Sequence, residues 1–150
     1  MIRQKTAVAA LAAVAVLGAT SVAAGQQTKT TKVRAALNTG QETPKPRGTK
    51  VGASGLFTGT LNGTTLTWRL TWKQLTGPAT AAHIHMARRG KPGPVIVPLC
   101  GPCTSPATGT ATLTTAQVTS LRRAGLYVNV HTARNQGGEI RGQLTTTIPR

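Results

Sequence analysis

Alternation of apolar and polar side chains is the main pattern along this chain, and it predicts β-strands. Val33, Ala35 and Leu37 are each separated by one residue, which is the period of a strand with one buried face. The same period occurs between 126 and 132 and again between 139 and 145. Together with shorter β-branched runs, the pattern predicts strands over 33–37, 80–86, 94–99, 109–113, 126–132 and 139–145.

A hairpin is the most specific structural signal, because turn chemistry and alternation coincide between 53 and 72. Asn62-Gly63 is a favoured two-residue turn, since both of its central positions need positive φ. This turn predicts a register in which Phe57 faces Trp68, and it puts the large apolar residues of the second strand on one face. The opposite face then carries mainly threonines.

One short helix is predicted directly after the strand over 109–113. Thr114 and Gln117 match a capping box, Val118 and Leu121 form an apolar stripe, and Gly125 suits the C-terminal stop. About eight short strands with one short helix indicate an all-β fold. We expect an antiparallel Greek-key β-sandwich or barrel.

The first 24 residues have the order of a secretory signal peptide. Arg3 and Lys5 precede an apolar run over 7–19, and small residues follow up to Ala24. The run is shorter than the roughly 20 residues of a membrane span. We therefore predict cleavage after Ala24, a flexible polar segment over 25–32, and a mature protein outside the cytoplasm with no transmembrane segment.

Charge and composition narrow the function classes. The 150 residues include 18 Lys plus Arg and 2 Asp plus Glu, for a net charge of +16. Without Arg3 and Lys5 the charge is +14 (16 − 2). A paired-carboxylate glycosidase or an all-carboxylate Ca²⁺ site would need both Glu42 and Glu139, the only side-chain carboxylates. A complete Ser-His-Asp triad is excluded because the chain has no Asp, although a Glu could take the place of the Asp.

Three histidines are the main candidate chemistry. His83 and His85 lie in one predicted strand and project from the same face, with Cα atoms about 6.6 Å apart. If the strand of His131 is a neighbour, three imidazoles can meet and hold Cu²⁺ or, second, Zn²⁺, with a position left open. Arg141 or Arg134 would then attract a small anion to that position. The alternative is that each histidine bonds to a backbone group and braces a loop.

The two cysteines are separated by two residues, in Cys100-Gly101-Pro102-Cys103. These letters match a thioredoxin-like redox motif, but that motif needs a helix to start at the first cysteine, and Pro106 and the strand pattern argue against one. A local structural disulfide is therefore favoured. A redox role and a shared metal site with the histidines are the alternatives.

The excess of basic residues indicates anionic partners. Apart from 88–91 and 122–123, the Lys and Arg residues are scattered along the chain. Aromatic residues make up only 3% of the chain, too few for a base-stacking platform, and no nucleic-acid motif is present. We expect anionic cell-surface polymers or an extracellular protein as partners, and no specific nucleic acid.

Several short motifs resemble those of the CHRD domain, a module of the secreted protein chordin and of many bacterial secreted proteins. The sequence departs from the usual pattern at 86–89, where the family has a small glycine-rich turn. The matching segments are LNTGQETP (37–44), AAHIH (81–85), GPVIVPL (93–99), GLYVNVHT (125–132) and GGEIRGQL (137–144). The predicted division is a signal peptide (1–24), a flexible segment (25–32), a CHRD-like β domain (33–146) and a tail (147–150).

The resemblance implies an extracellular β module without an assigned catalytic activity, and Glu42 and Glu139 lie inside its motifs. A fainter likeness is to copper/zinc superoxide dismutases, which also have a His-x-His strand and a later Val-His strand end. The chain lacks the other histidines and the aspartate of their zinc site, so we do not expect dismutase activity. The predicted function is a non-catalytic binding or structural module. The alternative is a copper or zinc protein with a mononuclear site, in which His83, His85 and His131 are the ligands. Such a protein could be redox-active.

Overall fold

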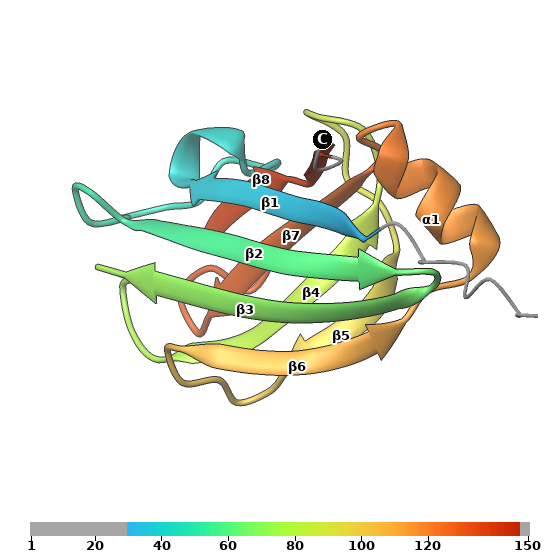
Figure 1. Ribbon diagram of the computed structural model, residues 1–150. Coiled ribbons are helices and arrows are strands. Elements are labelled where there is room, and N and C mark those ends of the chain that lie inside the picture. The colour runs from blue at the N-terminus through green and yellow to red at the C-terminus, as the bar shows by residue number, and fades with distance from the viewer. Residues whose placement is uncertain (1–29, 148–150) are drawn as a thin grey trace, which may run out of the picture.

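The computed structural model describes residues 30–147, so the predicted signal peptide and its cleavage site lie outside the described residues. The chain forms β-strands and one α-helix, as predicted (Figure 1). The elements are β1 (Thr31–Asn38), the 3₁₀ helix η1 (Thr39–Gln41), β2 (Ser54–Asn62), β3 (Thr65–Lys73), β4 (Ala79–Met86), β5 (Val95–Cys100), β6 (Ala107–Thr112), α1 (Thr115–Arg122), β7 (Leu126–Thr132), β8 (Ile140–Gln143) and β9 (Thr145–Thr147).

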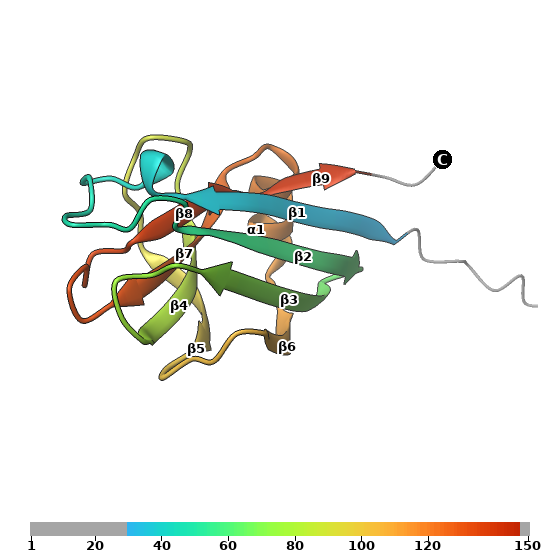
Figure 2. The same ribbon diagram turned by 90° about the vertical axis from the view of Figure 1, so that its left-hand side faces the viewer.

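The strands form one antiparallel sheet that curls into a nearly closed barrel. Its order is β5-β4-β7-β8-β1-β2-β3-β6, with β9 added beside β1. β5 and β6, the two ends of this order, come into contact without pairing. Strands β3 to β6 therefore follow a Greek key, with β3 beside β6. Figures 1 and 2 show β1, β2, β3 and β6 as one layer and β8, β7, β4 and β5 as the other.

The ends of the domain differ slightly from the prediction. β1 begins at Thr31, two residues before the expected start, because Thr31 and Lys32 already pair with Leu61 and Thr60. The strand predicted over 139–145 is divided into β8 and β9. The Leu144 N–H bonds to Leu126 of β7, whereas β9 pairs with β1. The chain thus passes from one neighbour to another at Leu144.

The predicted hairpin is present, but the register predicted for it was wrong by two residues. Phe57 faces Leu70 and Gly59 faces Trp68, so the two-residue turn is Gly63-Thr64 instead of Asn62-Gly63. Gly63 has a φ of +59°, which suits a type II′ turn with glycine at its first central position. A shift of two keeps every side chain on its predicted face, so the predicted buried face remains correct.

The helix α1 has the predicted start but a different stop. The Thr114 side chain accepts from Gln117 N–H and the Gln117 side chain accepts from Thr114 N–H, which completes the capping box. At the other end Ala124, not Gly125, has the left-handed φ of +51°. The N–H groups of Ala124 and Gly125 bond back to Leu121 and Ser120, the pattern of a Schellman motif.

The barrel interior holds the hydrophobic core. Trp68 is 5% exposed and stacks near Phe57, with ring centroids 6.2 Å apart. Glycines face Trp68 from both neighbouring strands, Gly59 on β2 and Gly109 on β6. A Cβ at Gly109 would lie 2.7 Å from the Trp68 ring, so the indole occupies the space that a side chain there would need.

All residues of β7 are buried, including those that face away from the core, and the same is true of β8. The outward side chains of β7 are polar or amphipathic and are covered by loops. The three histidines lie on this covered polar face of β7 and its neighbours.

No helix among residues 30–147 has the length and apolar character of a membrane span.

Candidate metal centre

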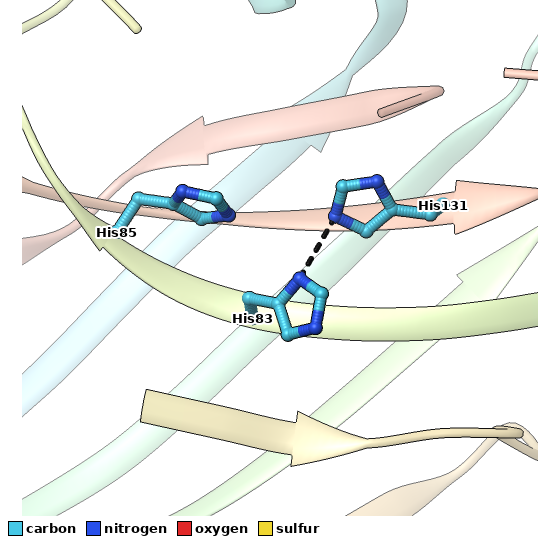
Figure 3. Close-up of side chains that lie close together, drawn as sticks. All are labelled: His83, His85 and His131. Carbon is cyan, nitrogen blue, oxygen red and sulfur yellow. Dashed lines mark hydrogen bonds between the residues drawn. The ribbon is translucent and has the colours of Figure 1, made fainter. Parts of the chain in front are cut away.

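His83, His85 and His131 come together on the outer face of β4 and β7. β4 and β7 are antiparallel neighbours, with His83 opposite Asn129 and His85 opposite Tyr127. One nitrogen of each imidazole lies within 4.8 Å of the others, and Figure 3 shows the three rings gathered over the two strands. The sequence predicted this convergence on the condition that the strands were neighbours, and that condition holds.

Backbone carbonyls fix the orientation of two of these rings. The Nδ1 of His131 lies 2.8 Å from the Gln136 carbonyl oxygen, and the Nδ1 of His85 lies 2.9 Å from that of Gly93. Because a carbonyl only accepts, each Nδ1 carries the proton. In the neutral imidazole the Nε2 lone pair is then free. These loop contacts are those of the bracing alternative, and they coexist with the convergence.

The third ring completes the cluster. His83 Nδ1 lies 3.0 Å from His131 Nε2, whereas His85 Nε2 is buried without a hydrogen-bond partner. His83 is half-buried and the other two are 8% exposed, so the cluster opens to solvent at His83. An unpartnered buried nitrogen costs about 1–3 kcal/mol. His85 Nε2 is therefore an acceptor with no donor among the described residues.

Burial favours the neutral form of two of these imidazoles, those of His83 and His131. Burial and the neighbouring His131 and His85 lower the pKa of His83. Burial and, to a smaller extent, His85 lower the pKa of His131, although its bond to Gln136 acts in the opposite direction. The neutral form is the one that offers a lone pair.

A buried stack holds His85 from behind. The Tyr127 ring lies parallel to His85, with centroids 4.7 Å apart and an interplanar angle of 7°. The Arg141 guanidinium carbon lies 3.4 Å from the Tyr127 centroid. His85 is on β4 and Arg141 on β8, the two strands that flank β7, so Tyr127 is held between them. No local sequence pattern predicts this stack, because its members are far apart in the chain.

The two arginines proposed as anion-attracting groups differ in placement. Arg141 is 1% exposed, and its Nη2 donates to the Arg88 carbonyl at 3.1 Å. Arg134 is exposed on the loop after β7, and its guanidinium lies against Gly48. Their role toward an anion stays a prediction.

Buried polar atoms without a hydrogen-bond partner concentrate on the face beside the histidines. Besides His85 Nε2, those among residues 30–147 are Glu42 Oε2, Asn129 Oδ1, Arg141 Nη1 and Gln143 Oε1. Glu42 is 1% exposed and accepts from Thr43 N–H at 2.9 Å. Burial raises the pKa of Glu42, although Thr43 N–H, Arg141 and the nearby Asn129 amide act against this.

Glu139, unlike Glu42, has hydrogen-bond partners at both carboxylate oxygens. It is fully buried and accepts from Thr76 N–H and the hydroxyls of Thr76 and Thr132, at 2.5–2.8 Å, and from the Asn135 amide at 3.2 Å. Burial alone would raise its pKa, but these hydrogen bonds together lower it. Asn135 also bonds to the backbone of Arg47 at 2.8 and 3.2 Å, so Glu139 connects three loops.

The cysteines form the predicted local disulfide. Cys100 and Cys103 are joined with an S–S distance of 2.11 Å at the end of β5. Among residues 30–147 the histidine cluster has no cysteine or glutamate member. This excludes the shared cysteine–histidine metal site within the described part of the chain.

Comparison with known proteins gives one match. No curated protein and no solved structure matches the chain. The family model of the CHRD domain matches residues 33–144, which span β1 through β8 and contain all three histidines, Glu42 and Glu139. The chain therefore belongs to the CHRD domain family.

Proposed function

We propose that this CHRD-domain protein binds one copper ion through His83 Nδ1, His85 Nε2 and His131 Nε2, with zinc as the second choice. The observation that carries the proposal is the convergence of three imidazole nitrogens within 4.8 Å, one of which is buried with no other partner. Tetrahedral ligands at about 2.0–2.1 Å from an ion are about 3.3 Å apart. The 3.0 Å pair and the 4.8 Å limit bracket that separation.

The surroundings of the ligands fit a metal as well as the ligands do. Metal-binding histidines generally donate their second N–H to a carbonyl or carboxylate, which fixes the ring and the tautomer. His85 and His131 make such bonds to Gly93 and Gln136. For His83 to offer Nδ1, its proton must be on Nε2, so binding replaces the His83–His131 hydrogen bond.

The donor set favours copper over the other divalent ions. Three neutral imidazoles suit copper and zinc, and copper is the tighter of the two at a given nitrogen site. With no carboxylate in the cluster, Ca²⁺ and Mg²⁺ lack the oxygen ligands they require. A bound copper ion supplies one-electron chemistry. The half-buried His83 leaves the ligand face open to a small molecule.

We further propose that the protein acts outside the cytoplasm as a binding module. The signal-like residues 1–24, the Cys100–Cys103 disulfide and the family all support this location.

A competition titration tests the copper proposal. The protein without an affinity tag is titrated with Cu²⁺ against a chromogenic chelator, beside the variants His85→Ala and Gln136→Ala. We expect one tightly bound ion per chain. His85→Ala should lower the copper affinity by at least about 100-fold, which is more than the loss of a hydrogen-bond partner of a ligand would cause. Gln136→Ala should match the parent, because it keeps the carbonyl that His131 contacts. Equal affinity of His85→Ala and the parent would refute the proposal.

A further inference from the structure

The surface of the described chain carries charges of one sign. The only two side-chain carboxylates, Glu42 and Glu139, are 1% and 0% exposed. Of the Lys and Arg residues between 30 and 147, Arg141 alone is buried. No acidic side chain in this range therefore offsets the exposed cations, so the charged side chains on the described surface are all positive.

One face combines this charge with a regular array of hydroxyls. It is the outer face of β1, β2, β3 and β6, the front layer in Figure 1. In one row across these strands Lys32, Thr60, Thr67 and Thr110 lie side by side. The next row is Arg34, Thr58, Arg69 and Thr108. We call this surface the threonine–cation face.

The cations of this face have spacings set by the strands. Lys32 and Arg34 lie about 6.6 Å apart along β1, and Arg69 lies two strands away from Arg34, about 10 Å across the sheet. Lys73 follows Arg69 on β3 at about 13 Å. The four positive groups are therefore spread out and not clustered at one point, an arrangement that suits a linear polymer with several acidic groups.

The face carries two shallow depressions. A shallow depression of about 350 Å³ is lined by Lys32, Thr58, Thr67 and Arg69, among others. A second of about 350 Å³ lies along the same two strands and is lined by Leu56, Trp72 and Lys73, among others; Trp72 is partly buried and packs against the core. The Lys32 ammonium donates to the Thr60 hydroxyl at 3.3 Å, so cations and hydroxyls lie close enough to contact one ligand group together.

The polar character of the face selects among anionic polymers. Phe57, Trp68 and Leu70 project to the opposite side of the sheet, into the core. In the part of the chain that the structure describes, the two rows contain no aromatic side chain on which a base could stack. Threonine hydroxyls both donate to and accept from sugar hydroxyls.

We propose that the threonine–cation face binds a linear anionic polysaccharide. Lys32, Arg34, Arg69 and Lys73 pair with its acidic groups, and the threonines contact its sugar hydroxyls. This site is on the opposite layer from the histidine cluster and does not depend on copper binding.

Retention on immobilised dextran sulfate tests the proposal, with uncharged dextran as the matrix control. The test variant replaces the four cations of the face: Lys32→Gln, Arg34→Gln, Arg69→Gln and Lys73→Gln. The control variant makes the same charge change on exposed residues outside β1–β3: Lys50→Gln, Arg89→Gln, Lys91→Gln and Arg122→Gln. Both lose four positive charges, so a difference between them reports position and not net charge.

We expect the parent to bind dextran sulfate and not dextran. The negative slope of log affinity against log salt should become shallower by about 3 in the test variant, at about 0.7–0.9 per lost contact. In the control variant it should become shallower by less than about 1. Unchanged copper affinity and thermal midpoint would show that the test variant is folded. If it is not, the pair Lys32→Gln and Arg69→Gln takes its place, with Lys50→Gln and Arg122→Gln as its control.

Equal losses in the test and control variants would overturn the proposal, because they would assign retention to overall charge. Absence of retention at low salt would overturn it as well. Tighter binding of the parent to oligothymidine than to dextran sulfate would replace the polysaccharide with a nucleic acid.

Discussion

Replacing Glu139 with glutamine removes the charge from the most highly connected buried side chain at one end of the barrel. The carboxylate accepts four hydrogen bonds, one at Oε1 from Thr76 N–H and three at Oε2. Glutamine keeps one acceptor oxygen and places an NH₂ group at the other position. There it faces the Asn135 amide, which donates to Oε2 at 3.2 Å in the parent.

The expected loss follows from these contacts. A hydrogen bond to a charged group contributes about 1.5–3 kcal/mol, and an unsatisfied buried donor costs about 1–3 kcal/mol. The Thr76 and Thr132 hydroxyls can turn to accept from the new amide, whereas the Asn135 donor cannot. We therefore expect Glu139→Gln to destabilise the fold by about 2–4 kcal/mol, a large share of the roughly 5–15 kcal/mol of a typical domain.

Urea unfolding at pH 7, followed by tryptophan fluorescence, measures this change. Glu42→Gln is the matched control, because Glu42 is equally buried but has one unpartnered oxygen and a raised pKa. It should change the stability by less than about 1 kcal/mol. If Glu139→Gln changes the free energy of unfolding by no more than Glu42→Gln, the hydrogen bonds of Glu139 do not stabilise the fold as described.

The pKa of Glu139 also predicts a pH dependence. Its folded pKa is below the usual 4.5, so its contribution is complete above that value and is lost as the pH falls through the folded pKa. The acid-side decline in stability should therefore be shallower in Glu139→Gln than in the parent. An equal decline in both proteins would assign it to another group.

Three further predictions concern Glu42, the helix cap and the stack behind His85. The folded pKa of Glu42 is above 4.5, so its contribution is complete below 4.5 and is lost as the pH rises through the folded pKa. Glu42→Gln should remove that decline when the free energy of unfolding in urea is measured at a series of pH values. An unchanged dependence on pH would contradict this. Thr114→Ala should cost about 1 kcal/mol through loss of the N-cap, and thermal unfolding beside the exposed control Thr115→Ala checks it. Tyr127→Leu should weaken copper binding about 10-fold, whereas Tyr127→Phe keeps the stack; similar affinities of both variants would disprove the positioning role.

The strands and the helix start could be predicted because they depend on local patterns. The alternation at Val33, Ala35 and Leu37 and the capping box of Thr114 each lie within a few residues. The hairpin register was wrong because both candidate turns contain Gly63, and both leave Phe57 and Trp68 on the same face. Only the pairing of the whole hairpin distinguishes them.

The convergence of the three histidines could be predicted from the sequence, but the groups that surround them could not. His83 and His131 are 48 residues apart, and they meet because β4 pairs with β7 in the sheet. The acceptors that orient His85 and His131 are backbone carbonyls, which every residue has. The burial of Glu42 and Glu139 likewise depends on loops that pack over the sheet, and no local pattern indicates it.

Electron paramagnetic resonance of the one-to-one copper complex tests the central claim most directly. The untagged parent and its His83→Ala and His85→Ala variants are compared at equal copper occupancy. Coordination by His83, His85 and His131 predicts hyperfine coupling to three imidazole nitrogens in the parent and a changed spectrum in each variant. The same spectrum in all three proteins would show that copper binds elsewhere and would contradict the proposed metal centre.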